Sequence, residues 1–198
     1  MTSWPKVYIA GPGVFLPDAG EIGRAKKALC RRYGLEGLFP LDAEVSGRAP
    51  GQRRDRAIYR ALVAMMTHAD CGIFDLTPFR GVSADVGTVF ELGMLAGLGK
   101  PVFGYSNVGA EYRSRLEAAG LAAHDGEKWR DPLGMLVEDF GNADNLMLDA
   151  CLAEGGFPMV RMEVAEENRF RDLRGFEACL RLAGRALLGE PALKARRS

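Results

Sequence analysis

The chain has 198 residues, of which 47% are hydrophobic and 26% are charged. These values are typical of one globular domain and exclude a disordered or collagen-like chain. Its 26 basic and 26 acidic residues cancel, so no net charge favours nucleic acid or an anionic membrane surface.

No stretch approaches the ~20 apolar residues of a membrane span, and the first residues lack the long apolar core of a signal peptide. The four cysteines are widely spaced and form no C-x-x-C pair, which predicts small buried side chains rather than a metal or redox site. These are Cys30, Cys71, Cys151 and Cys179. We therefore expect a cytoplasmic protein that needs no metal and no cofactor.

Glycine is unusually frequent, at 25 of 198 residues, about 13% against the ~7% of average proteins. Glycine suits positions where the backbone turns tightly or comes close to another group. The positions of the glycines are therefore a first clue to the site.

The first half of the chain alternates strands with helices. Residues 6–10 are expected to form a buried strand that ends at Gly11, and a helix follows over 18–33. A short strand is expected at 37–40. A helix over 52–68 and a uniformly apolar strand at 69–76 come next.

The second half continues the alternation less clearly. The pattern predicts a helix over 83–99 and a strand at 101–105, and then a polar, glycine-broken stretch. A short helix over 144–153, a last strand at 158–162 and a C-terminal helix over 168–188 follow. The basic end of the chain, residues 194–198, is expected to be solvated.

This alternation predicts an α/β fold, a doubly wound parallel sheet of about five strands with helices on both faces. We expect a single domain over 1–198, in which 107–157 is an insertion that completes the active site and 168–198 forms the C-terminal helix and tail. Ligands bind such sheets at the carboxyl ends of the strands. Gly11, the segment after Asp75 and the loop after Tyr105 are therefore expected to share one crevice.

The first turn does not carry a phosphate-binding fingerprint. In Gly11-Pro-Gly-Val-Phe-Leu16 the third glycine of the dinucleotide motif is replaced by Leu16, and Pro12 has no amide hydrogen to offer. No G-K-[ST] motif occurs in the chain. The sequence thus predicts neither a classical nicotinamide dinucleotide site nor a P-loop.

The helix over 83–99 contains one acid in apolar surroundings. From Val86 to Leu98 only Thr88 and Glu91 are neither apolar nor small, which predicts a helix buried on nearly all sides. A buried carboxylate costs several kcal/mol unless it is compensated. Gly87 and Thr88 lie one turn earlier and would leave a slot open toward the helix N-terminus, whose dipole favours the ionised form. The alternative is a structural ion pair with Arg80.

Two further acids are expected at the same sheet edge. Asp75 ends a strand, and Asp85 precedes the helix, where it could equally be an ordinary N-cap. Three converging acids are compatible with a magnesium site or with a pair of carboxylates for glycosidic chemistry.

Four segments together resemble the nucleoside 2-deoxyribosyltransferase family, in the same order along residues 6–148. They are Lys6-Val-Tyr-Ile-Ala-Gly-Pro-Gly-Val-Phe-Leu-Pro-Asp18, Asp75-Leu-Thr-Pro-Phe-Arg-Gly81, Asp85-Val-Gly-Thr-Val-Phe-Glu-Leu-Gly93 and Asp144-Asn-Leu-Met-Leu148. The resemblance implies a flavodoxin-like fold and transfer of 2-deoxyribose between nucleobases by double displacement, in a role in nucleotide salvage. The substrates would be a 2-deoxynucleoside and a free nucleobase.

The resemblance also implies roles for single residues. Glu91 matches the nucleophile that forms a covalent deoxyribosyl intermediate, and Tyr8 matches the tyrosine that orients it. Asp85 and Asp75 match acids that hold the base and handle its proton. Asn145, with Met147 nearby, matches an asparagine supplied to a neighbouring subunit, which implies a homo-oligomer. The expected substrate-binding residues are Asp75, Gly11, Phe15, Arg80, Gly87, Asn145 and Met147.

Two other functions remain compatible with the sequence. A nucleoside 5′-monophosphate N-glycosidase needs a phosphate cradle; the loop at 11–18 has no Arg or Lys, although Arg80 and Ser83 could serve. A non-catalytic nucleotide-sensing module of the same fold would tolerate Gln at position 91. We also expect Gly93, Gly97 and Gly99 to let their helix pack closely on its neighbours.

Overall fold

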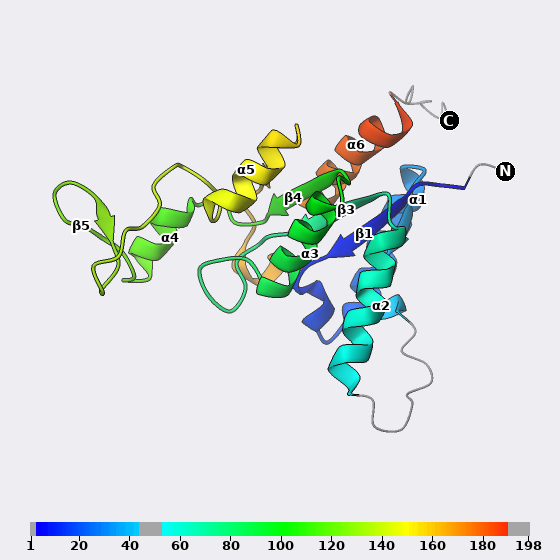
Figure 1. Cartoon of the computed structure of the whole chain (residues 1–198), viewed down its shortest axis with the longest axis horizontal. Helices are drawn as coiled ribbons and strands as arrows, with labels where there is room; N and C mark the ends of the chain where they lie inside the picture. The colour runs from blue at the N-terminus through cyan, green and yellow to red at the C-terminus, as the bar shows by residue number, and fades with distance from the viewer. Residues whose placement is uncertain (1–2, 44–52, 190–198) are drawn as a thin grey trace.

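One parallel sheet forms the centre of the molecule. The computed structural model describes residues 3–43 and 53–189, and its main sheet has the strand order β2-β1-β3-β4-β7 (Figure 1). All four pairings are parallel. The strands are β1 (Lys6–Ala10), β2 (Glu36–Leu38), β3 (Cys71–Asp75), β4 (Val102–Ser106) and β7 (Val160–Arg161). The predicted five-stranded, doubly wound sheet is confirmed.

Helices cover both faces of this sheet. The helices α1 (Ala19–Arg32) and α6 (Arg174–Leu188) lie on one face. The other face carries α2 (Arg54–His68), α3 (Val86–Gly97) and α5 (Leu146–Glu154). Three short 3₁₀ turns are η1 (Pro12–Phe15), η2 (Pro40–Asp42) and η3 (Glu166–Asn168).

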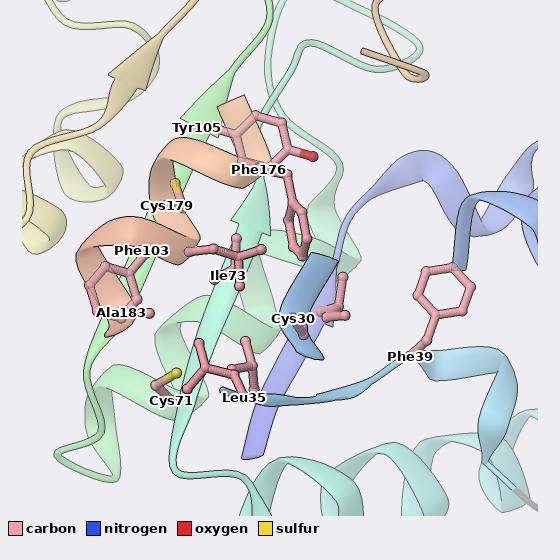
Figure 2. Close-up of a cluster of buried hydrophobic side chains, with 13 residues drawn as sticks. Cys30, Leu35, Phe39, Cys71, Ile73, Phe103, Tyr105, Phe176, Cys179 and Ala183 are labelled. Atoms are coloured by element: carbon pink, nitrogen blue, oxygen red, sulfur yellow. The ribbon is translucent and has the colours of Figure 1, made fainter. Parts of the chain in front are cut away.

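Side chains alternate between two hydrophobic clusters along each strand. On β3, Cys71 and Ile73 belong to the cluster under α1 and α6, which Figure 2 shows. Phe74 belongs to the cluster under α2, α3 and α5, together with Tyr8 of β1. Asp75 follows Phe74 and therefore projects toward α1 and α6, whereas Tyr8 projects toward α3. This difference decides which acidic side chains can lie next to Tyr8 on the α3 face.

Residues 107–143 contain elements that the sequence did not predict. They include α4 (Tyr112–Ala118) and an antiparallel hairpin of β5 (Ala123–His124) and β6 (Trp129–Arg130). In Figure 1 this segment, with α4 and β5, extends away from the sheet on the side where β4 and α5 lie. Large apolar side chains after the hairpin are exposed, namely Leu133, Met135, Leu136 and Phe140.

The helix that carries Glu91 is less buried than its sequence predicts. Val86 is 83% exposed and Phe90 is 54% exposed, because one side of α3 faces away from the sheet. A Cβ added at Gly93, Gly97 or Gly99 would meet nothing within 4 Å. The predictions of burial on all sides and of close packing at these glycines are therefore wrong for the single chain.

Several helix starts also differ from the prediction, including that of α5, which begins at Leu146 after its N-cap Asn145. The helix α3 begins at Val86 because Asp85 caps it. The helix α6 begins at Arg174, since residues 166–168 form η3 and a turn follows. The predicted start of α2 at Gln52 and the basic tail at 194–198 lie outside the described residues.

Cys30, Cys71 and Cys179 are buried as predicted, Cys151 is half-buried, and all four thiols are free. Across residues 3–43 and 53–189, no helix has the length and apolar character needed to cross a membrane.

Candidate active site

A hydrogen bond between Tyr8 and Glu91 is the centre of the site. Tyr8 lies on β1 and is fully buried, and its hydroxyl donates to Glu91 Oε1 at 2.7 Å. No hydrogen bond to Glu91 Oε2 occurs within 3–43 and 53–189. One carboxylate oxygen is thus held by Tyr8, and the other has no hydrogen-bond partner among the described residues.

Burial raises the pKa of Glu91 to about 7, and the negative charge of Asp85 adds to this effect. The hydrogen bond from Tyr8 opposes both by stabilising the carboxylate. The pKa of Tyr8 is raised well above its usual range, chiefly by burial and then by the charge of Glu91. Tyr8 therefore remains a hydrogen-bond donor, and Glu91 is divided between its two forms near neutral pH.

Asp85 caps the helix that carries Glu91. Its Oδ2 accepts from the Thr88 backbone N–H and from the Thr88 hydroxyl, both at 3.0 Å. A Cβ at Gly87 would lie 3.1 Å from that oxygen, so glycine leaves room beside the carboxylate. The N-cap reading of Asp85 is confirmed, and its charge also reaches Glu91.

Asp75 does not join this pair. Its side chain is 1% exposed and lies on the α1 and α6 face, where its Oδ1 accepts from the Thr77 N–H at 3.1 Å. Burial raises its pKa, while the nearby charge of Lys26 lowers it. Strand alternation directs the side chains of Asp75 and Tyr8 to opposite faces of the sheet, so Asp75 makes no direct contact with the Tyr8–Glu91 pair. That Asp75 lines the same crevice at the carboxyl ends of the strands stays a prediction. Within the described part of the chain, no group of three or more acids, histidines or cysteines could hold a metal ion.

The alternative that Glu91 pairs with Arg80 is also wrong. The Arg80 guanidinium lies 5.1 Å from the centre of the Phe15 ring and 4.6 Å from that of Phe79. The two rings stack on each other at 5.3 Å. Arg80 has a φ of 57°, a conformation that costs about 1 kcal/mol or more outside glycine. These contacts join the first loop, residues 11–18, to the loop at 79–81.

A buried acid that the sequence did not single out connects α3 to α5. Asp144 receives hydrogen bonds from the Ser83 hydroxyl and from the Ala84 N–H, and it pairs with Arg115 at 3.3 Å. It also accepts from the N–H of Asn145. Asp144 was visible only as part of the Asp144–Leu148 motif, since its partners are far away in sequence.

Asn145 is the N-cap of α5. Its Oδ1 accepts from the Met147 N–H at 3.0 Å, and its Nδ2 donates to Glu138 Oε1 at 2.8 Å. Met147 is 69% exposed. A cavity of about 420 Å³ lies on the outer side of α5, lined in part by Phe140, Ala150 and Met159. It contains none of the predicted site residues.

Comparison with known proteins identifies the family of the chain. The sequence model of the nucleoside 2-deoxyribosyltransferases matches residues 7–147, and the chain belongs to this family. An uncharacterised protein of Schizosaccharomyces pombe is 31% identical over 185 residues, covering 83% of this chain and 85% of that protein.

Solved structures share the fold. A 2-desoxiribosyltransferase from Leishmania mexicana is 32% identical, with a TM-score of 0.57 over 84% of this chain and 94% of that one. A conserved protein from Enterococcus faecalis V583 is 16% identical, with a TM-score of 0.51 over 91% of this chain and 99% of that one, and shows the fold alone. Together, the family and the Leishmania structure support deoxyribosyltransferase activity.

Proposed function

We propose that the protein transfers 2-deoxyribose between nucleobases through a covalent intermediate on Glu91. The observation that carries this proposal is the hydrogen bond from buried Tyr8 to one oxygen of Glu91, within a family of deoxyribosyltransferases. A retaining transfer needs an ionised, oriented carboxylate beside the anomeric carbon. Partial desolvation makes this carboxylate a better nucleophile than one in water.

The reaction proceeds in two balanced steps. In the first, Glu91 Oε2 attacks the anomeric carbon, the bond to the nucleobase nitrogen breaks, and an acid supplies the proton that the departing base takes up. In the second, the nitrogen of an incoming base attacks the same carbon, Glu91 leaves as a carboxylate, and the proton returns to the acid. We assign Asp85 to the proton and Asp75 to holding the base, the roles that the family resemblance implies for these two acids; Asp85 caps the helix that carries Glu91 and would supply the proton in its acid form.

An unphosphorylated nucleoside fits the surroundings better than a 5′-monophosphate. The Ser83 hydroxyl donates to the Asp144 carboxylate. Arg171, which lies against the first loop, pairs with Asp18 at 2.8 Å. Of the two candidate phosphate donors, Ser83 is therefore occupied by a carboxylate, and the Arg80 guanidinium lies over the rings of Phe15 and Phe79. We place the activity in nucleoside salvage.

We further propose that the enzyme works as a homo-oligomer. Val86 and Phe90 of the Glu91 helix are exposed beside Tyr59, whose ring lies 6.3 Å from that of Phe90. A second copy that covers this face would also close the site. The side-chain oxygen Oδ1 of Asn145 accepts one hydrogen bond, from Met147 N–H. Its second lone pair is available to a sugar hydroxyl bound in a neighbouring subunit.

Incubation with thymidine and free adenine tests the activity. We expect deoxyadenosine and thymine in equal amounts by chromatography. Release of thymine without deoxyadenosine would instead indicate hydrolysis. No reaction with any deoxynucleoside or deoxynucleotide would indicate a sensing module.

Light scattering tests the assembly. Phe90→Asp is expected to dissociate the oligomer and reduce exchange, because a carboxylate replaces an apolar contact. Leu41→Asp, at an exposed position on η2, is the matched control and should leave the mass unchanged. A monomeric wild type that catalyses exchange would contradict this proposal.

A further inference from the structure

A lysine is buried beneath the first loop. Lys26 of α1 is 2% exposed, and it occupies the same helix face as Ile22 and Cys30, which are also buried. Its Nζ donates to the Tyr105 hydroxyl at 3.3 Å and lies 5.2 Å from the centre of the Phe176 ring. A lysine is almost never fully buried unless it is paired, so this ammonium needs an acceptor of opposite charge.

Asp75 supplies that opposite charge: burial lowers the pKa of Lys26, and the negative charge of Asp75 opposes this shift. Tyr105 is its direct neighbour on β4, and the positive charge of Lys26, the Thr77 hydrogen bonds and the Tyr105 hydroxyl all oppose the burial that raises the pKa of Asp75. Lys26 donates to the Tyr105 hydroxyl, and Tyr105 lies directly opposite Asp75 on the same face of the sheet. The Tyr105 hydroxyl therefore lies between the ammonium and the carboxylate.

The other titratable groups near Lys26, Tyr105 and Asp75 cannot supply the positive charge that Lys26 provides. Burial raises the pKa of the Cys30 thiol to about 12 and raises that of the Cys179 thiol further. Both thiols are therefore neutral at working pH. Asp172, which precedes α6, acts on Tyr105 with a negative charge. Among the residues that the structure describes, Lys26 supplies the positive charge facing Asp75.

The network supports the first loop directly. A Cβ on Gly11 would lie 2.4 Å from the Cβ of Asp75, and one on Gly13 would lie 3.9 Å from Lys26 Nζ. The ring of Tyr105 is fixed from the other side, where a Cβ on Gly175 would lie 2.6 Å from it; Figure 2 shows Tyr105 beside Phe176 under α6. The loop that carries Phe15 thus rests on Asp75 and Lys26.

We propose that Lys26 is a positioning residue of the active site: through the Tyr105 hydroxyl it holds Asp75 as a carboxylate beneath the first loop and so fixes where the nucleobase binds. This inference rests on the proposed function, since Asp75 is assigned there to holding the nucleobase. Lys26 gives up no proton during transfer. Its loss therefore weakens base binding more than it slows the chemical steps.

Steady-state kinetics at pH 8.5, where Glu91 is ionised, test this role with thymidine as donor and adenine as acceptor. For Lys26→Met we expect KM for adenine to rise about tenfold or more while kcat changes less than about twofold, which is the pattern of lost binding. Lys27→Met is the matched control: Lys27 is the next residue on α1 and pairs with Asp42 near the surface. It should leave both constants unchanged.

A double mutant tests the link to Asp75. If Lys26 acts through that carboxylate, Lys26→Met combined with Asp75→Asn should raise KM no more than Asp75→Asn alone. If instead the two substitutions raise KM for adenine by factors that multiply in the double mutant, the proposal is overturned. A Lys26→Met enzyme whose KM equals that of Lys27→Met while the wild type catalyses exchange would also overturn it. A wild type without exchange would refute the proposed function instead.

Tyr105→Phe keeps the test decisive if Lys26→Met does not fold. It removes one hydroxyl and retains the ring that packs on α6. We expect the same selective rise in KM for adenine, smaller than in Lys26→Met. An unchanged KM in Tyr105→Phe would show that the hydroxyl does not connect Lys26 to the site.

Discussion

Replacing Glu91 by Gln should abolish transfer and, at the same time, stabilise the fold above pH 7. Burial is the main reason that the pKa of Glu91 rises from its usual 4.5 to about 7. The folded state therefore binds this proton more tightly than the unfolded state, and wild-type stability falls as pH rises between these two values. At 1.36 kcal/mol for each pKa unit, the loss is about 3 kcal/mol above pH 7. Gln is neutral and still accepts the hydrogen bond from Tyr8. The Glu91→Gln variant therefore does not lose this stability as the pH rises.

Urea denaturation between pH 4 and 9 measures this effect as the difference in free energy of unfolding between variant and wild type. The difference should be near zero below about pH 4.5, where Glu91 is protonated in both states, and should grow through pH 7. Glu154→Gln, at an exposed position on α5, is the control and should give a flat difference. A flat difference for Glu91→Gln would refute the claim that Glu91 is held desolvated beside Tyr8.

Three further results are expected. The acid limb of kcat/KM for exchange should have its midpoint near pH 7, because the carboxylate of Glu91 is the attacking form; full activity at pH 5 would contradict this. Gly11→Ala should lower the free energy of unfolding by about 2 kcal/mol or more, since its Cβ would overlap that of Asp75 at a φ of 140°; a urea midpoint equal to that of wild type would contradict it. Asp144→Asn should cost about 3 kcal/mol because it leaves the buried Arg115 cation unpaired, and a loss below about 1 kcal/mol would show that the pair is unimportant.

The sheet and the Glu91 helix were predictable from sequence because their signals are local. Uniformly apolar strands and helical spacing predicted every strand of the parallel sheet. The Asp85 cap and the buried carboxylate followed from the same helix. The pairing of Tyr8 with Glu91 came from the family resemblance, since the two residues are 83 positions apart.

The remaining features depend on facts that one chain's sequence does not display. Apolar periodicity marks Val86 and Phe90 as hydrophobic, but it does not distinguish a core from a surface that a second subunit covers. The face on which Asp75 lies depends on strand register relative to Tyr8. Lys26 was missed because a lysine in a helix is normally exposed, although its spacing from Ile22 and Cys30 places it on the buried side.

Mass spectrometry of the intact protein tests the nucleophile most directly. The enzyme is mixed with thymidine alone, quenched in acid after one turnover, and digested to locate any adduct. The mechanism predicts one deoxyribosyl group on Glu91 in the wild type and none in Glu91→Gln. An adduct on another residue, or exchange at the wild-type rate by Glu91→Gln, would contradict it.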